Sequence, residues 1–280
     1  AQAAITATEI LSSVFDDTNV RRLKDPTQTM QATLASRLEV AADRLDQEDL
    51  GDSLRHAQLK LQLGAAMLSL DSPHKAVKVL ESAYPVLSQR TGTSSKETLE
   101  CNSYLAEAYL ALGKADLALP ILEQTYTLAR QSTSLDQSFV LETKGNLATT
   151  YLECGPFSKG LDMLKQTVDE MEWELGEADY RTLVCANNLA FAYEQLDQLD
   201  EAHRLLSRSL PIAENTFGES HVHTISARNN LAKVLFRQGD RASALAEFEK
   251  NHRLAKYDLG EGHSQTIDAL GNLAHVYVGV

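Results

Sequence analysis

The sequence predicts an all-α protein, a right-handed superhelical solenoid of antiparallel helix pairs. Leucine recurs every 42 residues along most of the chain, and small residues recur at fixed distances from each leucine. Glycine and proline are scarce, with 14 and 6 among 280 residues. A fixed period of this length is typical of repeat architectures, and few glycines and prolines suit long helices with short connections.

The leucine register needs no insertion or deletion. Its members are Leu63, Leu105, Leu147, Leu189, Leu231 and Leu273. The next residue is always small, a glycine in the first unit and an alanine in the others. Four positions after each leucine stands a large residue, tyrosine in four of the six cases. Agreement in so many registers predicts that every unit folds in the same way.

Each unit is expected to form two helices. In the fourth unit, Leu189, Ala190 and Tyr193 fall on one face of a first helix. A turn at 198–200 precedes a second helix with the small residue Ala202 near its start. Small residues at both places let the helix backbones approach closely, so a bulky replacement should cost about 1–3 kcal/mol by overpacking.

Turn-forming residues mark the helix ends. One set follows the first helices and comprises Asp71, Gly113, Gly155, Asp197 and Gly239; another follows the second helices and comprises Gly92, Gly176, Gly218 and Gly260. Glycine in the second set suits a left-handed residue that ends a helix. Ser95 and Asp179 are expected to cap the next first helix. In the third unit Ser134 and Val140 replace the usual glycine and threonine, which predicts a looser junction there.

The predicted layout has two parts. Residues 1–53 form an N-terminal helical capping segment, with one short helix at ILSSVFDD and a second that places Leu34, Leu38 and Leu45 on one face. Residues 54–280 form five 42-residue repeats plus the first helix of a sixth. A half repeat leaves an apolar face uncovered. We therefore expect either a continuation beyond Val280 or self-association into a homo-oligomer through this face.

Composition and motifs exclude several classes of function. The net charge of −13 disfavours nucleic acid and anionic membrane surfaces, and no apolar run is long enough to insert into a membrane. Three cysteines without a C-x-x-C pair favour a reducing, cytoplasmic location. No catalytic or cofactor motif is present, so we expect no enzyme activity and no cofactor. His221 and His223 form H-x-H, but two ligands do not make a metal site.

The order Leu-small-x-x-Tyr, then glycine, then a small residue resembles the tetratricopeptide signature. The phrases LGEADYRT, FGESHVHT and LGEGHSQT, with NNLA at 187–190 and 229–232, resemble the kinesin-light-chain-like subclass. This resemblance implies a non-catalytic scaffold that binds a peptide or protein in its concave groove. The N-terminal helices resemble the region after the catalytic domain of bacterial serine/threonine kinases. The alternative is therefore a regulatory or substrate-recruiting region of such a kinase, acting partly through self-association.

By the same resemblance, the groove residues lie beside the leucine register. They are Asn146, Asn187, Asn188, Asn229, Asn230 and Asn272, together with Phe191, Lys233 and Arg237. An asparagine amide offers a donor and an acceptor, so it can pair with a peptide bond. The alternative is that these amides bond within the scaffold and join one repeat to the next.

Three further groups of side chains have roles that the repeat registers suggest. Lys233, Arg237 and Arg228 cluster in the fifth unit and could receive an acidic peptide or a carboxylate; ordinary surface charge is the alternative. Cys101 and Cys185 share one register and are expected to be buried packing residues. Trp173 is interpreted as packing between repeats, with a binding anchor as the alternative.

Overall fold

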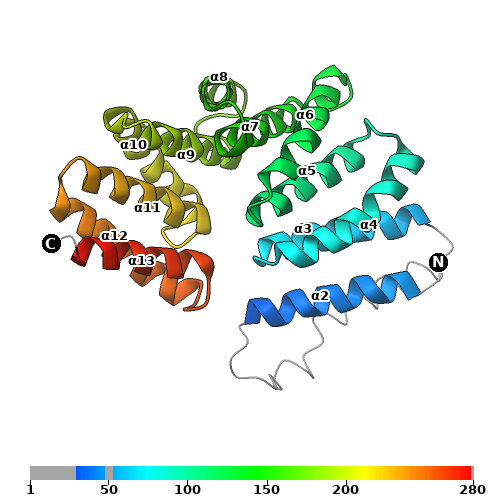
Figure 1. Ribbon diagram of the computed structural model, residues 1–280, viewed down its shortest axis with the longest axis horizontal. Coiled ribbons are helices and arrows are strands. Elements are labelled where there is room, and N and C mark those ends of the chain that lie inside the picture. The colour runs from blue at the N-terminus through cyan, green and yellow to red at the C-terminus, as the bar shows by residue number, and fades with distance from the viewer. Residues whose placement is uncertain (1–29, 48–52, 279–280) are drawn as a thin grey trace. The chain divides into compact units, whose positions relative to one another are not determined.

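The computed structural model describes residues 30–47 and 53–278 (Figure 1). Within these ranges the chain forms twelve α-helices and no strand. The helices are α2 (Met30–Gln47), α3 (Ser53–Ser69), α4 (Pro73–Thr91), α5 (Lys96–Ala111), α6 (Ala115–Gln131), α7 (Gln137–Cys154), α8 (Phe157–Glu174), α9 (Tyr180–Gln195), α10 (Leu199–Phe217), α11 (Val222–Arg237), α12 (Arg241–Asp258) and α13 (Ser264–Val278). None of these helices is long and apolar enough to cross a bilayer.

The chain divides into two compact units, Ala1–Leu135 and Asp136–Val280. The boundary lies in the connection between α6 and α7, next to Ser134, where the sequence departs from the repeating glycine. The first unit contains α2 to α6 and the second contains α7 to α13.

Within each unit the helices pack as a succession of antiparallel pairs. A first helix contacts the second helix of its own repeat, as α7 contacts α8, and that second helix contacts the first helix of the following repeat, as α8 contacts α9. Consecutive first helices also touch, α3 with α5, α7 with α9, α9 with α11 and α11 with α13. Each pair thus buries its apolar face only against its neighbours, as the repeat solenoid predicted from the sequence requires.

The predicted small residues line the seams between helices. The alanine after the leucine is fully buried in the second to fifth repeats, and so are the second-helix alanines Ala76, Ala118, Ala202 and Ala244. In the third repeat two helix backbones approach closely, because a Cβ atom built on Gly160 of α8 would lie 2.8 Å from the carbonyl oxygen of Ala148 on α7. A methyl group added at this seam should therefore destabilise the helix pair by overpacking.

Most of the predicted turn residues adopt a positive φ. Asp71, Gly113, Asp197 and Gly239 have φ between 54° and 88°. Gly155 differs, with φ −113° and ψ −161°, because the following Pro156 disfavours helical backbone in the residue before it. The glycines after the long helices match their prediction: Gly218 has φ 95° and ψ 159°, a region that essentially only glycine occupies.

Side-chain caps start the first helices as predicted at two positions. Ser95 Oγ accepts the N–H of Thr98, and Asp179 accepts the N–H of Arg181. His221 takes the same place on α11, where its Nδ1 accepts the N–H of His223. A cap requires an unprotonated Nδ1, and burial lowers the pKa of His221. His221 is therefore a helix cap.

Helix α2 covers the first full repeat. It contacts α3 and α4, and its Leu38, Ala41 and Leu45 are buried in the same cluster as Leu61 and Leu80. The short helix expected at ILSSVFDD lies outside the described residues.

Two predictions about packing have opposite outcomes. Cys101 and Cys185 are buried free thiols, and burial raises the pKa of each to about 12, so both are packing residues as expected. The interpretation of Trp173 as a packing residue is wrong, because 86% of its side chain is exposed. Trp173 lies late in α8 with its side chain in solvent. Tyr257, in the same register of α12, is likewise 87% exposed.

Candidate binding surface on the first helices

The predicted site residues of the second unit lie on four consecutive first helices. Asn146 is on α7, Asn187, Asn188 and Phe191 are on α9, Asn229, Asn230, Lys233 and Arg237 are on α11, and Asn272 is on α13. Because α7, α9, α11 and α13 each contact the next one, the fold brings these residues into neighbouring rows. We call the exposed side chains of these four helices the first-helix surface.

The asparagines form hydrogen bonds from one repeat to the next. Asn230 Nδ2 donates to Asn187 Oδ1 at 2.9 Å, and Asn272 Nδ2 donates to Asn229 Oδ1 at 2.9 Å. Both bonds join residues 43 positions apart, because the asparagine just before the leucine meets the one two before the leucine in the previous repeat. We call these two bonds, together with the bond that Asn188 donates to Thr149, the asparagine ladder.

The ladder changes its acceptor where the third repeat lacks the second asparagine. Gly145 occupies that position, so Asn188 Nδ2 donates instead to Thr149 Oγ1 at 3.2 Å. Asn187 Nδ2 donates in the other direction, to Ser226 Oγ at 3.3 Å. Thr149 and Ser226 were not among the predicted site residues. These two hydrogen bonds join residues 39 positions apart in the sequence. They could have been predicted only from the shift of adjacent first helices along their axes.

The ladder asparagines keep hydrogen-bonding capacity for a ligand. An amide carries two N–H donors and an oxygen with two lone pairs, and the ladder uses one donor of Asn188, Asn230 and Asn272. All three side chains are partly exposed. The scaffold bonds foreseen as the alternative do form, and they leave the second donor and the carbonyl oxygen of each of these amides for a further partner.

Side chains of different chemistry flank the ladder. Phe191, two positions after Leu189, is 43% exposed. Lys233 takes the same register on α11 and is partly exposed, as is Thr149 on α7. An apolar ring and an ammonium group therefore lie on neighbouring helices, each beside a partly exposed amide.

In the expected basic cluster, the two arginines already form ion pairs within the protein. Arg237 bonds to the backbone and carboxylate oxygens of Glu194 and to Asp197 Oδ1, so it ties α11 to the end of α9. These carboxylates, Glu194 foremost, raise the pKa of Arg237. Arg228 has no exposed side-chain surface. Of the three cations, Lys233 is the one that the described contacts leave without an ion pair.

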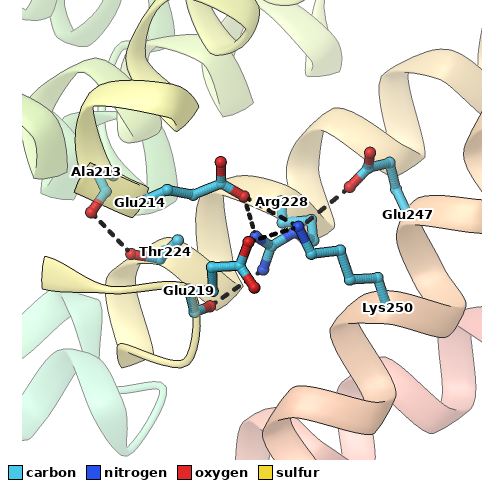
Figure 2. A network of polar contacts seen from close by, with 7 residues as sticks. All are labelled: Ala213, Glu214, Glu219, Thr224, Arg228, Glu247 and Lys250. Atoms are coloured by element: carbon cyan, nitrogen blue, oxygen red, sulfur yellow. Dashed lines mark hydrogen bonds and ion pairs between the residues drawn. The ribbon is translucent and has the colours of Figure 1, made fainter.

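Arg228 is the centre of a polar network inside the second unit (Figure 2). Its Nη2 bonds to Glu214 of α10, its Nη1 donates to the carbonyl oxygen of Glu219 at 3.1 Å, and its Nε lies 3.4 Å from Glu247 of α12. Lys250 joins the network through Glu219 at 3.0 Å and Glu214 at 3.3 Å. The guanidinium thus connects α10, α11 and α12 and has a structural role.

The first unit has a cleft beside its own first helices. A cleft of about 460 Å³ lies beside α3 and α5, lined by Arg55, Gln58 and Gln62 of α3 and by Glu97 and Glu100 of α5. Burial raises the pKa of Glu100 despite the nearby Lys96. This cleft was not predicted, because the first two repeats lack the asparagines on which the sequence argument depended.

Known proteins share this architecture. A tetratricopeptide repeat family model matches residues 139–215 and again 184–256, and a second tetratricopeptide model matches residues 103–124. The chain belongs to the tetratricopeptide repeat proteins. This family membership supports a role as a protein-interaction scaffold, and proteins of the family are generally non-catalytic. No curated protein matches the tetratricopeptide chain described here.

Solved structures with a similar fold include kinesin-light-chain-like proteins. Nearly identical repeats of a putative kinesin light chain from Podosopora anserina are 24% identical, with a TM-score of 0.55, and cover 74% of this chain and 98% of theirs. BtubC (BKLC) from P. vanneervenii is 18% identical, with a TM-score of 0.55 and coverage of 90% and 84%. A Rap protein is 12% identical, with a TM-score of 0.59 and coverage of 89% and 71%. At these identities the comparison shows the fold alone.

Proposed function

We propose that this tetratricopeptide protein is a non-catalytic scaffold whose first-helix surface binds an extended peptide segment of a protein partner. The observation that carries the proposal is the row of partly exposed ladder amides on helices that lie side by side. Each amide can offer a donor and an acceptor to the backbone of a bound peptide, whatever its side chains. A peptide in this position would cross α9 and α11.

The flanking residues would set sequence preference. Phe191 suits an apolar side chain of the peptide, and Lys233 suits a carboxylate. Arg237 remains in the proposed surface through its position beside Glu194, although its charge is already paired. The Rap protein of similar fold is described in complex with Competence and Sporulation Factor, which is consistent with capture of a ligand by this architecture.

Substitution of the ladder asparagines distinguishes a role in peptide binding from a role in stabilising the fold. We expect the double change Asn188→Ala and Asn230→Ala to weaken a peptide selected from a display library by roughly tenfold or more. Two ladder bonds are also lost, so stability should fall by about 1–3 kcal/mol in total. Phe191→Ala should weaken the same peptide with unchanged stability, because the ring is exposed. Isothermal titration calorimetry and thermal unfolding measure the two effects.

The matched control is Gln166→Ala, an exposed amide on second helix α8, which should change neither quantity. If the double variant loses stability but binds every selected peptide as before, the ladder is scaffold only. If Phe191→Ala also leaves affinity unchanged, the proposed surface is not the binding surface.

Self-association is a second candidate function, favoured by α13. Ile267 and Tyr277 are 58% and 55% exposed, whereas Ile225 and Leu235 in the same registers of α11 are buried. Helix α12 covers that face of α11, and none of the described residues covers it on α13. A second copy could bury these side chains against its own α13.

Sedimentation velocity tests this candidate. The chain should form dimers as its concentration rises, and the double change Ile267→Asp and Leu270→Asp should keep it monomeric. Leu117→Asp with Leu196→Asp alters two exposed leucines elsewhere and serves as the control. A monomer at every accessible concentration would exclude self-association through α13.

A further inference from the structure

Trp173 stands at a position that the fold leaves to solvent. It is the single tryptophan of the chain and is 86% exposed on α8. The other members of its register, 42 residues apart, are also exposed: Gln89, Gln131, Asn215 and Tyr257. Three of these are polar amides. Packing therefore does not require an aromatic ring at this position, and the largest side chain of the set must be explained in another way.

Three exposed carboxylates lie close to Trp173 in the sequence. Asp169 and Glu177 lie four residues before and after it, on its own side of the helix or just beyond the helix end, and Glu174 follows it directly. No lysine, arginine or histidine occurs between Lys165 and Arg181. Among the described residues, no cation pairs with Asp169, Glu174 or Glu177. The surroundings of the ring are therefore strongly negative.

The two neighbouring carboxylates are already neutralised. Glu170 accepts a hydrogen bond from Lys144 Nζ at 2.8 Å, and Glu172 pairs with Arg208 of α10. These pairs hold α8 against α7 and α10. They account for Glu170 and Glu172 as structural residues and leave the other three acids without such a role.

A cleft extends the same surface towards α10. It has a volume of about 330 Å³, and Asp169 lines it together with Tyr193 of α9 and Glu201 and Arg204 of α10. Burial and then Glu201 raise the pKa of Tyr193. The cleft has mixed charge, because Arg208 also lines it and Lys165 Nζ lies 5.4 Å from the centroid of the Tyr193 ring.

We propose that Trp173, with Asp169, Glu174 and Glu177, docks a lysine- or arginine-rich segment of a protein partner. A cation over the indole face interacts with the ring quadrupole while its neighbours pair with the carboxylates. The same negative charge repels phosphate backbones and anionic lipid surfaces. This second surface lies on α8 and just beyond its end, so it is separate from the first-helix surface and could bind at the same time.

Intrinsic fluorescence tests the proposal, because all tryptophan emission comes from Trp173. Hexa-arginine at low ionic strength should change that emission in a saturable way, and hexa-glutamate should not. The triple change Asp169→Asn, Glu174→Gln and Glu177→Gln should lower the affinity for hexa-arginine by at least about fivefold. The matched control removes three exposed carboxylates elsewhere, by Asp71→Asn, Asp116→Asn and Asp268→Asn, and should have a much smaller effect.

Trp173→Gln, which places the residue of Gln89 and Gln131 in this register, should melt at the wild-type temperature. It should bind labelled hexa-arginine at least about twofold more weakly by fluorescence anisotropy. Unchanged tryptophan emission would overturn the proposal. Equal weakening by the two triple variants, which indicates diffuse attraction, would also overturn it, as would wild-type affinity of Trp173→Gln.

Discussion

Replacing Arg228 with alanine should destabilise the unit Asp136–Val280 by about 3–5 kcal/mol. The guanidinium is completely buried, and Glu214 and Glu247 approach it from two other helices. Its loss leaves these carboxylates facing each other with one cation fewer, and leaves the carbonyl oxygen of Glu219 without its donor. It also removes a large side chain from the seam between α10, α11 and α12.

Thermal and urea unfolding, followed by circular dichroism, measure this effect. Arg208→Ala is the matched control, because Arg208 also pairs with a glutamate but is half exposed, and it should change stability by less than about 1 kcal/mol. Arg228→Met keeps most of the volume and should lie between the two variants. A loss below about 1 kcal/mol for Arg228→Ala would show that the network in Figure 2 does not hold the three helices together.

Gly160→Ala should destabilise the same unit by about 1–3 kcal/mol, although alanine is the better helix former by about 1 kcal/mol. The new Cβ atom would lie 2.8 Å from the carbonyl oxygen of Ala148 and 3.0 Å from the backbone nitrogen of Leu152. Backbone atoms of α7 cannot move aside as a flexible side chain can. Helices α7 and α8 must therefore separate to admit the methyl group.

The informative control is Gly145→Ala on α7. A Cβ atom there would lie 3.6 Å from Cys185 Sγ, an ordinary contact, so this change should stabilise the protein by up to about 1 kcal/mol. The two variants make the same chemical change in facing helices and should shift the melting temperature in opposite directions. Stabilisation by both would mean that α7 and α8 do not approach as closely as described.

The contacts around Gly160 also show how far a repeat register can be used to predict packing. The other repeats have alanine at this position, as Ala202 does in the fourth, so the sequence alone makes Gly160→Ala a conservative change. The separation of each helix pair depends on all its contacts and varies between repeats. The register predicts that a small residue is needed, and only coordinates show which repeat has no room for a methyl group.

The fold and the rows of asparagines could be predicted, because both depend on a fixed period. The role of Arg228 could not. Its register contains Lys60, Asn102, Lys144, Ala186 and Leu270 in other repeats, so the sequence alone does not mark it as buried. Its partners Glu214 and Glu247 come from two other helices. Trp173 was misjudged for a related reason, since an aromatic residue in a helix suggests packing until the exposure of its whole register is known.

Hydrogen exchange with a bound peptide tests the central claim most directly. With a peptide selected on this chain, mass spectrometry should show new protection concentrated in 180–195 and 222–237, the first helices that carry Asn188 and Asn230. The second helices, including 157–174 around Trp173, should exchange as in the free protein. Protection confined to second helices, with α9 and α11 unchanged, would contradict binding at the first-helix surface.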